Sequence, residues 1–100
     1  MITLNTKQKK YLRALAHDLK PIVYIGKQGL NDAILKEADR ALSDHELIKV
    51  RFTDYKDEKK DLAEKIAAHT DAALLGITGH LACFYRRSSI DKKQRITLPQ

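Results

Sequence analysis

The chain has 100 residues, enough for one domain around a single hydrophobic core. With 43 % apolar and 32 % charged residues, its composition is that of a globular protein and excludes a disordered one. Uninterrupted apolar runs, such as residues 22–25 and 72–75, are far shorter than the ~18 residues of a membrane span. The N-terminus predicts no secretory signal, and the lone cysteine, Cys83, excludes an internal disulfide. We therefore expect a cytoplasmic domain that has no contact with a membrane.

The net charge of +6 is concentrated at the two ends of the chain. Residues 1–30 carry six basic side chains against Asp18 alone, and residues 86–95 carry five against Asp91. A positive face built from two basic ends is typical of proteins that bind polyanions such as nucleic acids. The alternative is a solvated surface with a high isoelectric point.

The first predicted helix begins at Thr6, whose hydroxyl can cap its first turn, and ends before Pro21. Its apolar stripe consists of Tyr11, Leu12, Leu15, Ala16 and Leu19, and the basic side chains Lys7, Lys9, Lys10 and Arg13 lie mostly off that stripe. Residues 21–25 are apolar and β-branched, which predicts a buried strand.

The second helix is predicted to be capped by Asn31 or Asp32 and to end at a break over residues 43–45. Its buried stripe consists of Ile34, Leu35, Ala38, Ala41 and Leu42. The strand at 46–52 then alternates, with Ile48, Val50 and Phe52 on one face and Leu47, Lys49 and Arg51 on the other. It is therefore a half-buried strand that presents two cations on one face.

A third helix follows, with Asp57 as its possible cap and with Leu62, Ala63, Ile66 and Ala67 facing inward. Residues 72–78 and 81–86 predict an antiparallel hairpin that turns at Gly79 and His80. In the tail, Ile96 and Leu98 either add an edge strand or remain loose. The order helix, strand, helix, strand, helix, strand, strand predicts an α/β fold with helices packed on a four-stranded mixed sheet.

The sequence offers little for catalysis. His17, His45 and His69 fall at predicted helix ends, where the helix dipole favours an imidazole, so their placement has a structural explanation. His80 and Cys83 lack the further ligands that a zinc site needs. Asp57, Glu58 and Asp61 alternate with lysines, as at a solvated helix start, and phosphate-binding or nucleophile motifs are missing. We expect a protein that is not an enzyme and has no cofactor, metal or small-molecule substrate.

The segment Gly26-Lys27-Gln28-Gly29 stands between a strand and a helix start. Glycines let a backbone approach a ligand closely, and the free N–H groups of a helix start favour an anion. Lys27 adds a flexible cation suited to a phosphate. The alternative is a plain turn with a solvated lysine. The basic first helix and the strand cations Lys49 and Arg51 favour the phosphate-binding interpretation.

Three blocks of the sequence together resemble the CRM domain (chloroplast RNA splicing and ribosome maturation) in its stand-alone bacterial, YhbY-like form. They are Leu19-Lys-Pro-Ile-Val-Tyr-Ile-Gly-Lys-Gln-Gly-Leu30, Asp44-His-Glu-Leu-Ile-Lys-Val50, and Gly79 followed by Phe84-Tyr-Arg86. The resemblance runs over about residues 6–87 and leaves 88–100 as a basic tail. It implies one RNA-binding domain spanning 1–100, with a fold similar to the carboxy-terminal domain of bacterial translation initiation factor three.

The resemblance also implies a function in ribosome assembly, on ribosomal RNA or a precursor of the large subunit. The predicted RNA-binding residues are Gly26, Lys27, Gln28, Gly29, Lys49, Arg51, Arg86, Lys7, Lys10 and Arg13. His80 stands where the family often has a lysine, and a neutral imidazole adds no charge near neutral pH. Of the aromatic residues, Tyr11, Tyr24, Phe52 and Phe84 are predicted to be buried, which leaves Tyr55 and Tyr85 for base stacking.

We expect backbone-dominated binding of modest sequence specificity by a monomer. The alternative functions are a protein-interaction adaptor on the ribosome, touching a ribosomal protein with its helices, and a small RNA-directed enzyme.

Overall fold

The computed structural model describes residues 3–87 and 96–99. Within them the elements follow in the predicted order: α1 (Thr6–Ala16), β1 (Val23–Ile25), α2 (Asp32–His45), β2 (Leu47–Phe52), a 3-10 turn (Lys56–Glu58), α3 (Lys59–Thr70), β3 (Ala73–Thr78) and β4 (Leu81–Tyr85). None of the helices in these residues is long and apolar enough to cross a bilayer.

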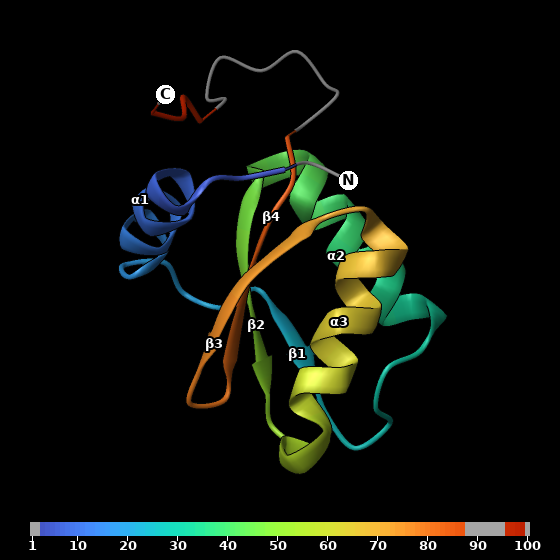
Figure 1. Cartoon of the computed structure of the whole chain (residues 1–100). Helices are drawn as coiled ribbons and strands as arrows, with labels where there is room; N and C mark the ends of the chain where they lie inside the picture. Colours follow the sequence, from blue (N-terminus) through green and yellow to red (C-terminus); the bar gives the residue numbers. More distant parts are fainter. Residues whose placement is uncertain (1–2, 88–95, 100) are drawn as a thin grey trace.

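The four strands form one mixed sheet in the order β1-β2-β4-β3. β1 runs parallel to β2, whereas β4 is antiparallel to both β2 and β3. Helices α2 and α3 lie side by side on one face of the sheet, and α1 lies on the other face near its upper end in Figure 1. This arrangement confirms the predicted α/β fold with helices on a four-stranded mixed sheet.

Each face of the sheet has its own core. The larger core lies under α2 and α3 and includes Ile48, Val50 and Phe52 of β2, so the alternation predicted for this strand is confirmed. The smaller core lies under α1 and contains Leu4, Leu12, Ala16, Leu47, Leu75 and Tyr85. Because α1 has only 11 residues, it covers one end of its face and leaves the rest of that face without a helix.

The strand register arranges the side chains of the α1 face in three rows. The row under α1 holds Leu47, Tyr85 and Ala73. The next row holds Lys49, Cys83 and Gly76, and the third holds Tyr24, Arg51, Leu81 and Thr78. We call the second and third rows together the open sheet face.

Several helix boundaries differ from the prediction. The cap of α1 is Asn5, not Thr6, because Asn5 and Gln8 exchange side-chain to backbone hydrogen bonds in a capping box. α1 ends at Ala16, so the predicted apolar stripe is only partly buried, and Tyr11, Leu15 and Leu19 are about 40 % exposed. The strand over 21–25 is likewise shorter than predicted and lies at an edge of the sheet.

The end of α2 and the start of α3 also differ from the prediction. The Asn31 cap of α2 is confirmed, but the helix continues through the predicted break to His45 and ends where Glu46 adopts a φ of 63°. Asp57 does not cap α3, because it lies inside the 3-10 turn that precedes the helix. The inward face predicted for α3 is confirmed.

The described part of the tail packs on the smaller core. Ile96 and Leu98 contact this cluster, the Ile96 N–H donates to Glu46 Oε1 at 2.7 Å, and Gln8 Nε2 donates to the Pro99 carbonyl at 3.0 Å. Of the two alternatives predicted for Ile96 and Leu98, neither holds among residues 96–99: these residues form no edge strand, and both side chains pack on the smaller core.

Candidate nucleic-acid interface

The open sheet face brings together the two strand cations and an aromatic ring. Lys49 and Arg51 point away from the larger core, as the alternation predicted. Arg51 is exposed and pairs in register with Tyr24 of β1, whose ring is 50 % exposed. Tyr24 also donates from its hydroxyl to the Pro21 carbonyl at 3.2 Å, which ties the ring to the segment just before its strand. The register therefore sets a half-exposed tyrosine next to an exposed arginine of the neighbouring strand.

Sequence reasoning missed Tyr24, because an apolar run was interpreted as a strand buried on both faces. As the edge strand of a sheet whose other face carries no helix at this end, β1 instead shows the pattern buried, exposed, buried. Tyr11 was likewise predicted to be buried and is 41 % exposed, whereas Tyr85 was a stacking candidate and is fully buried. Phe52 and Phe84 are buried as predicted.

Arg13 extends the positive charge from α1 onto the sheet. Its Nη1 donates to the Leu75 carbonyl of β3 at 3.1 Å, and Lys49 Nζ donates to the His17 carbonyl at the end of α1 at 3.2 Å. Each side chain makes one of these bonds and keeps further N–H donors for a ligand. Arg13 and Lys49 therefore lie on either side of the junction between α1 and the sheet.

Lys7 and Lys10 are exposed on α1 but point elsewhere. They lie five and two residues before the buried Leu12, which places them roughly opposite to it on the helix. The structure therefore does not bring them together with Lys49 and Arg51. Their role in RNA binding stays a prediction.

The glycine loop, residues 26–29, links β1 to the start of α2. The Gly29 N–H donates to the Gly26 carbonyl at 2.9 Å, and Gly29 has a φ of +67° that favours glycine. Lys27 and Gln28 at the tip are exposed. The loop thus presents two side chains outward on a tight, internally bonded turn.

Tyr55 holds this loop from outside. Its hydroxyl donates to the Lys27 carbonyl at 2.9 Å, and its ring lies against Gly29, where a Cβ would come within 3.3 Å of ring carbon Cε2. Tyr55 itself has a φ of 54° and precedes the 3-10 turn. It was predicted only as a base-stacking candidate, and nothing in its local sequence signals a contact across 28 residues.

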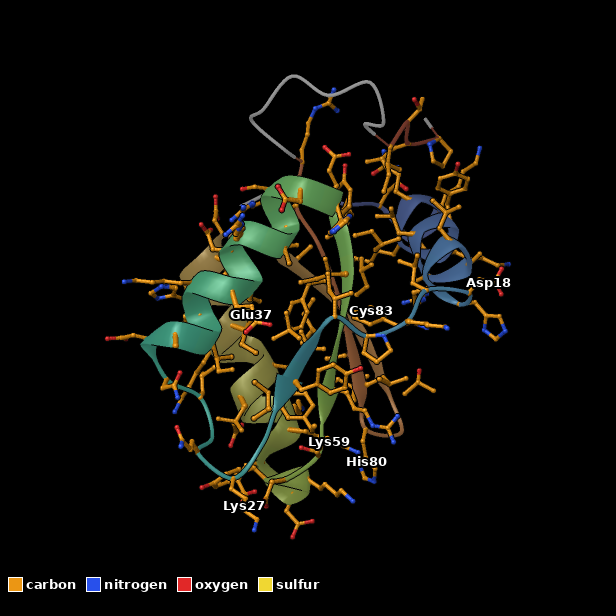
Figure 2. All side chains as sticks on the ribbon, turned by 180° about the vertical axis from the view of Figure 1, so that it is seen from behind. Asp18, Lys27, Glu37, Lys59, His80 and Cys83 are labelled. Atoms are coloured by element: carbon orange, nitrogen blue, oxygen red, sulfur yellow. The ribbon has the colours of Figure 1, made fainter. Side chains whose placement is uncertain are left out.

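The glycine loop, residues 53–58 and the hairpin turn Gly79–His80 meet at one end of the sheet, which we call the loop end. The Thr53 N–H donates to the Ile25 carbonyl at 2.9 Å, and the Phe52 N–H donates to the His80 carbonyl at 2.8 Å. Lys59 Nζ donates to the Gly79 carbonyl and lies 3.5 Å from His80 Nδ1. Figure 2 shows Lys27, Lys59 and His80 at this same end.

Positive charge at the loop end acts on His80. Desolvation by its neighbours, followed by the charges of Lys59, Lys56 and Arg51, lowers the pKa of His80 below its ordinary value. With its pKa lowered, the imidazole is mostly neutral near neutral pH and adds little charge to the loop end.

Arg86 lies outside this surface and is bonded within the protein. Its guanidinium forms an ion pair with the Asp39 carboxylate and donates at 2.8 Å to the carbonyls of Asp39 and Thr70 and to the Ser43 hydroxyl. These partners belong to α2 and α3, on the face of the sheet opposite to Lys49 and Arg51. Although it was predicted to contact RNA, its geometry is that of a residue joining two helices to β4.

The remaining candidates for catalytic or metal chemistry are the histidines and Cys83. His17, His45 and His69 lie at helix ends, as predicted. The parts of the chain that the structure describes hold no cluster of three or more residues able to ligate a metal. Cys83 is half-buried on the open sheet face.

Comparison with known proteins places this geometry in a family. The model of the CRS1/YhbY (CRM) domain matches residues 4–86. An RNA-binding protein of Haemophilus influenzae is 42 % identical, with 100 % of this chain and 99 % of that protein covered. The probable RNA-binding protein YqeI of Bacillus subtilis is 37 % identical, with 96 % and 99 % covered.

A solved structure has a similar fold and sequence. The solution structure of a hypothetical protein of Staphylococcus aureus, described as a candidate RNA-binding protein, has a TM-score of 0.79 and 42 % identity to this chain. The similarity covers 97 % of this chain and 100 % of that one. The chain therefore belongs to the CRS1/YhbY (CRM) domain family, which is not a family of enzymes.

Proposed function

We propose that the protein binds RNA through the open sheet face and the adjoining loop end. The observation that carries this proposal is the register that sets Lys49, Arg51 and Tyr24 side by side on the part of the sheet face that α1 leaves uncovered. Two relatives, one named an RNA-binding protein and the other a probable RNA-binding protein, support the same ligand.

The proposed contact is made mainly with the RNA backbone. Lys49, Arg51 and Arg13 attract phosphates, and Lys27 at the tip of the glycine loop adds another cation at the far end of the same surface. Attraction of this kind depends on salt and little on sequence. The Tyr24 ring beside Arg51 offers a platform for one base, and base stacking tolerates any sequence.

We further propose that the RNA is ribosomal RNA or a precursor of the large subunit, and that the protein acts as a cytoplasmic, monomeric assembly factor. This extension is supported by the resemblance to the stand-alone bacterial members of the family. Crosslinking in cell extract, followed by sequencing of the bound RNA, tests it directly. Recovery of precursor ribosomal RNA is expected, and recovery of unrelated RNAs in proportion to their abundance would overturn it.

RNA binding itself is tested by a pair of double variants with the same change of charge. Lys49→Ala with Arg51→Ala should weaken binding to purified ribosomal RNA and lower the slope of log affinity against log salt by up to about 1.5. Lys36→Ala with Arg40→Ala removes two exposed cations from α2, on the other side of the sheet, and should leave both quantities nearly unchanged. Equal losses in the two variants would mean that only net charge matters.

An apolar groove favours the adaptor function as the second candidate. It has a volume of about 470 Å³, and its lining includes Leu15, Leu19, Ile22, Leu47 and Ile96. Apolar contacts respond weakly to salt, so an adaptor would bind a ribosomal protein with little salt dependence. Strong, salt-sensitive binding to RNA free of protein, lost in the Lys49 and Arg51 double variant, separates the two functions.

A further inference from the structure

The edge strand β3 contains a bulge next to α1. Leu74 pairs with Phe84 and Gly76 pairs with Cys83, so Leu75 is an extra residue between them. The Leu75 side chain enters the smaller core under α1, and its carbonyl accepts the hydrogen bond from Arg13. A bulge changes the direction of neighbouring side chains and is common beside functional sites.

Beside this bulge the open sheet face is hollowed. The hollow has a volume of about 320 Å³ and is lined chiefly by Arg13, His17, Lys49, Gly76, Leu81 and Cys83. Gly76 contributes only backbone, and a Cβ there would point toward Arg13 and lie 3.8 Å from its Cδ. The missing side chain at this position is therefore part of what keeps the hollow open.

The walls of the hollow differ in chemistry. Its floor is apolar, made by Gly76, Leu81 and Cys83, while Arg13 and Lys49 stand at its border with α1. Both cations also affect the pKa of the Cys83 thiol. Burial raises the pKa of its thiol, and the positive charges of Lys49 and Arg13 partly oppose that rise. An apolar floor with adjacent cations suits a flat aromatic ligand that carries a negative charge.

We propose that this hollow holds one unpaired nucleotide of the bound RNA, with its base on the floor at Gly76 and Cys83 and its phosphate between Arg13 and Lys49. The proposal rests on the proposed RNA-binding function and adds a preference to it. Because bases inside a double helix are stacked on each other, only a single-stranded segment can place one here. The protein then binds RNA at a junction, with phosphates along the open sheet face and one splayed base beside α1.

Gly76→Val tests the proposal, since it fills the hollow without changing any charge. Gly76 is in a strand with an ordinary φ, and valine is well suited to strands, so the variant should keep its melting temperature. We expect roughly tenfold weaker binding to oligouridylate, which is the loss in affinity typical of removing one stacked base. The slope of log affinity against log salt should stay unchanged. Binding to a blunt RNA duplex should stay at the wild-type level. Ala68→Val, on exposed α3 surface, serves as the control.

Cys83 gives a second readout that needs no variant, because it is the single cysteine of the chain. Oligouridylate should slow its alkylation by N-ethylmaleimide, while the blunt duplex and an equal concentration of AMP should not. Protection by AMP as strong as that by the oligonucleotide would overturn the proposal in favour of a free-nucleotide site. Equal protection by duplex and single strand would also overturn it.

The outcomes separate this inference from the proposed function. If wild-type protein binds neither RNA, the proposed function fails. Another outcome is that wild-type protein binds both RNAs, that Lys49→Ala with Arg51→Ala binds neither, and that Gly76→Val binds both as tightly as wild type. The hollow is then empty in the complex, and only this inference fails. Should Gly76→Val unfold early, Cys83→Leu, which fills the hollow from β4, takes its place in the same assay.

Discussion

The phenol ring of Tyr55 closes over Gly29, leaving room for the hydrogen atom of glycine but little more. A Cβ at Gly29 would lie 3.3 Å from Cε2 and 3.4 Å from Cζ of that ring. The same tyrosine bonds to the carbonyl of Lys27, and the Gly29 N–H is used within the loop. The second glycine is therefore needed for the shape of the loop, which in turn fixes the direction of Lys27 and Gln28.

The two glycines of the loop should respond differently to alanine. Gly29→Ala meets both a positive φ and the Tyr55 ring, so we expect the free energy of unfolding to fall by about 1–2 kcal/mol. Gly26→Ala meets only ordinary contact, 3.7 Å from Thr53 Oγ1, and should change stability by less than about 0.5 kcal/mol. Urea denaturation of the two variants measures this difference. Equal effects would contradict the steric account.

The contacts of Tyr55 with the glycine loop can be weakened without changing the loop residues themselves. Tyr55→Phe removes the hydrogen bond to the Lys27 carbonyl and should lower stability by about 0.5–1 kcal/mol. Tyr55→Ala removes the ring as well. It should also weaken RNA binding, because the glycine loop then loses its fixed shape. Binding measured well below each melting temperature tests this. Unchanged RNA binding by a folded Tyr55→Ala variant would show that the glycine loop does not need Tyr55 to bind RNA.

Lys27 should act as a single phosphate contact. Lys27→Ala is expected to reduce the slope of log affinity against log salt by less than about 1, by a similar amount for RNAs of different sequence. Lys36→Ala on the exposed face of α2 carries the same change of charge and should leave the slope unchanged. A sequence-dependent loss at Lys27 would instead indicate contact with a base.

Much of this architecture follows from local pattern. The alternation in residues 46–52 gave both the core side of β2 and its cationic side, since a strand has only two faces. The stripes of α2 and α3 and the hairpin turn were also predictable from spacing alone. In each case neighbouring residues in the sequence determine the element, so no knowledge of distant contacts is required.

The parts that sequence reasoning missed depend on contacts between distant residues. Whether Tyr24 is buried depends on how much of the sheet α1 covers, and its own strand carries no sign of that. Arg86 is predicted to contact RNA because it closes a block that resembles the family, and its hydrogen bonds to Asp39, Ser43 and Thr70, 16 to 47 residues away, have no local signal in the sequence. The hollow at Gly76 lies beside a bulge, which the run of apolar residues in β3 does not reveal.

Arg86 should therefore prove to be a stability residue. Arg86→Met keeps much of the aliphatic length but removes the hydrogen bonds to α2 and α3, so we expect a loss of about 2 kcal/mol in the free energy of unfolding. Binding of the folded variant to RNA, measured at low temperature, should match the wild type. A loss of affinity without a loss of stability would return Arg86 to the RNA-binding surface.

His80 should make RNA binding depend on pH. In the free protein its pKa is lowered, so the folded chain takes up this proton less readily than the unfolded chain does. The contribution of His80 to stability therefore decreases as the pH falls below the ordinary pKa of histidine, although the exposed position keeps this effect small. RNA phosphates at the loop end act in the opposite direction, because they favour the imidazolium.

Affinity for RNA should thus rise as the pH is lowered from 7.5 to 5.5, and His80→Gln should remove the His80 share of that rise. Because a second histidine, His17, lines the hollow, the comparison of wild type with His80→Gln isolates the hairpin turn. His80→Lys places a permanent charge beside Lys59 and should tighten binding at pH 7.5 while slightly lowering the melting temperature. An unaltered pH response in His80→Gln, together with unchanged affinity in His80→Lys, would mean that RNA does not reach the hairpin turn.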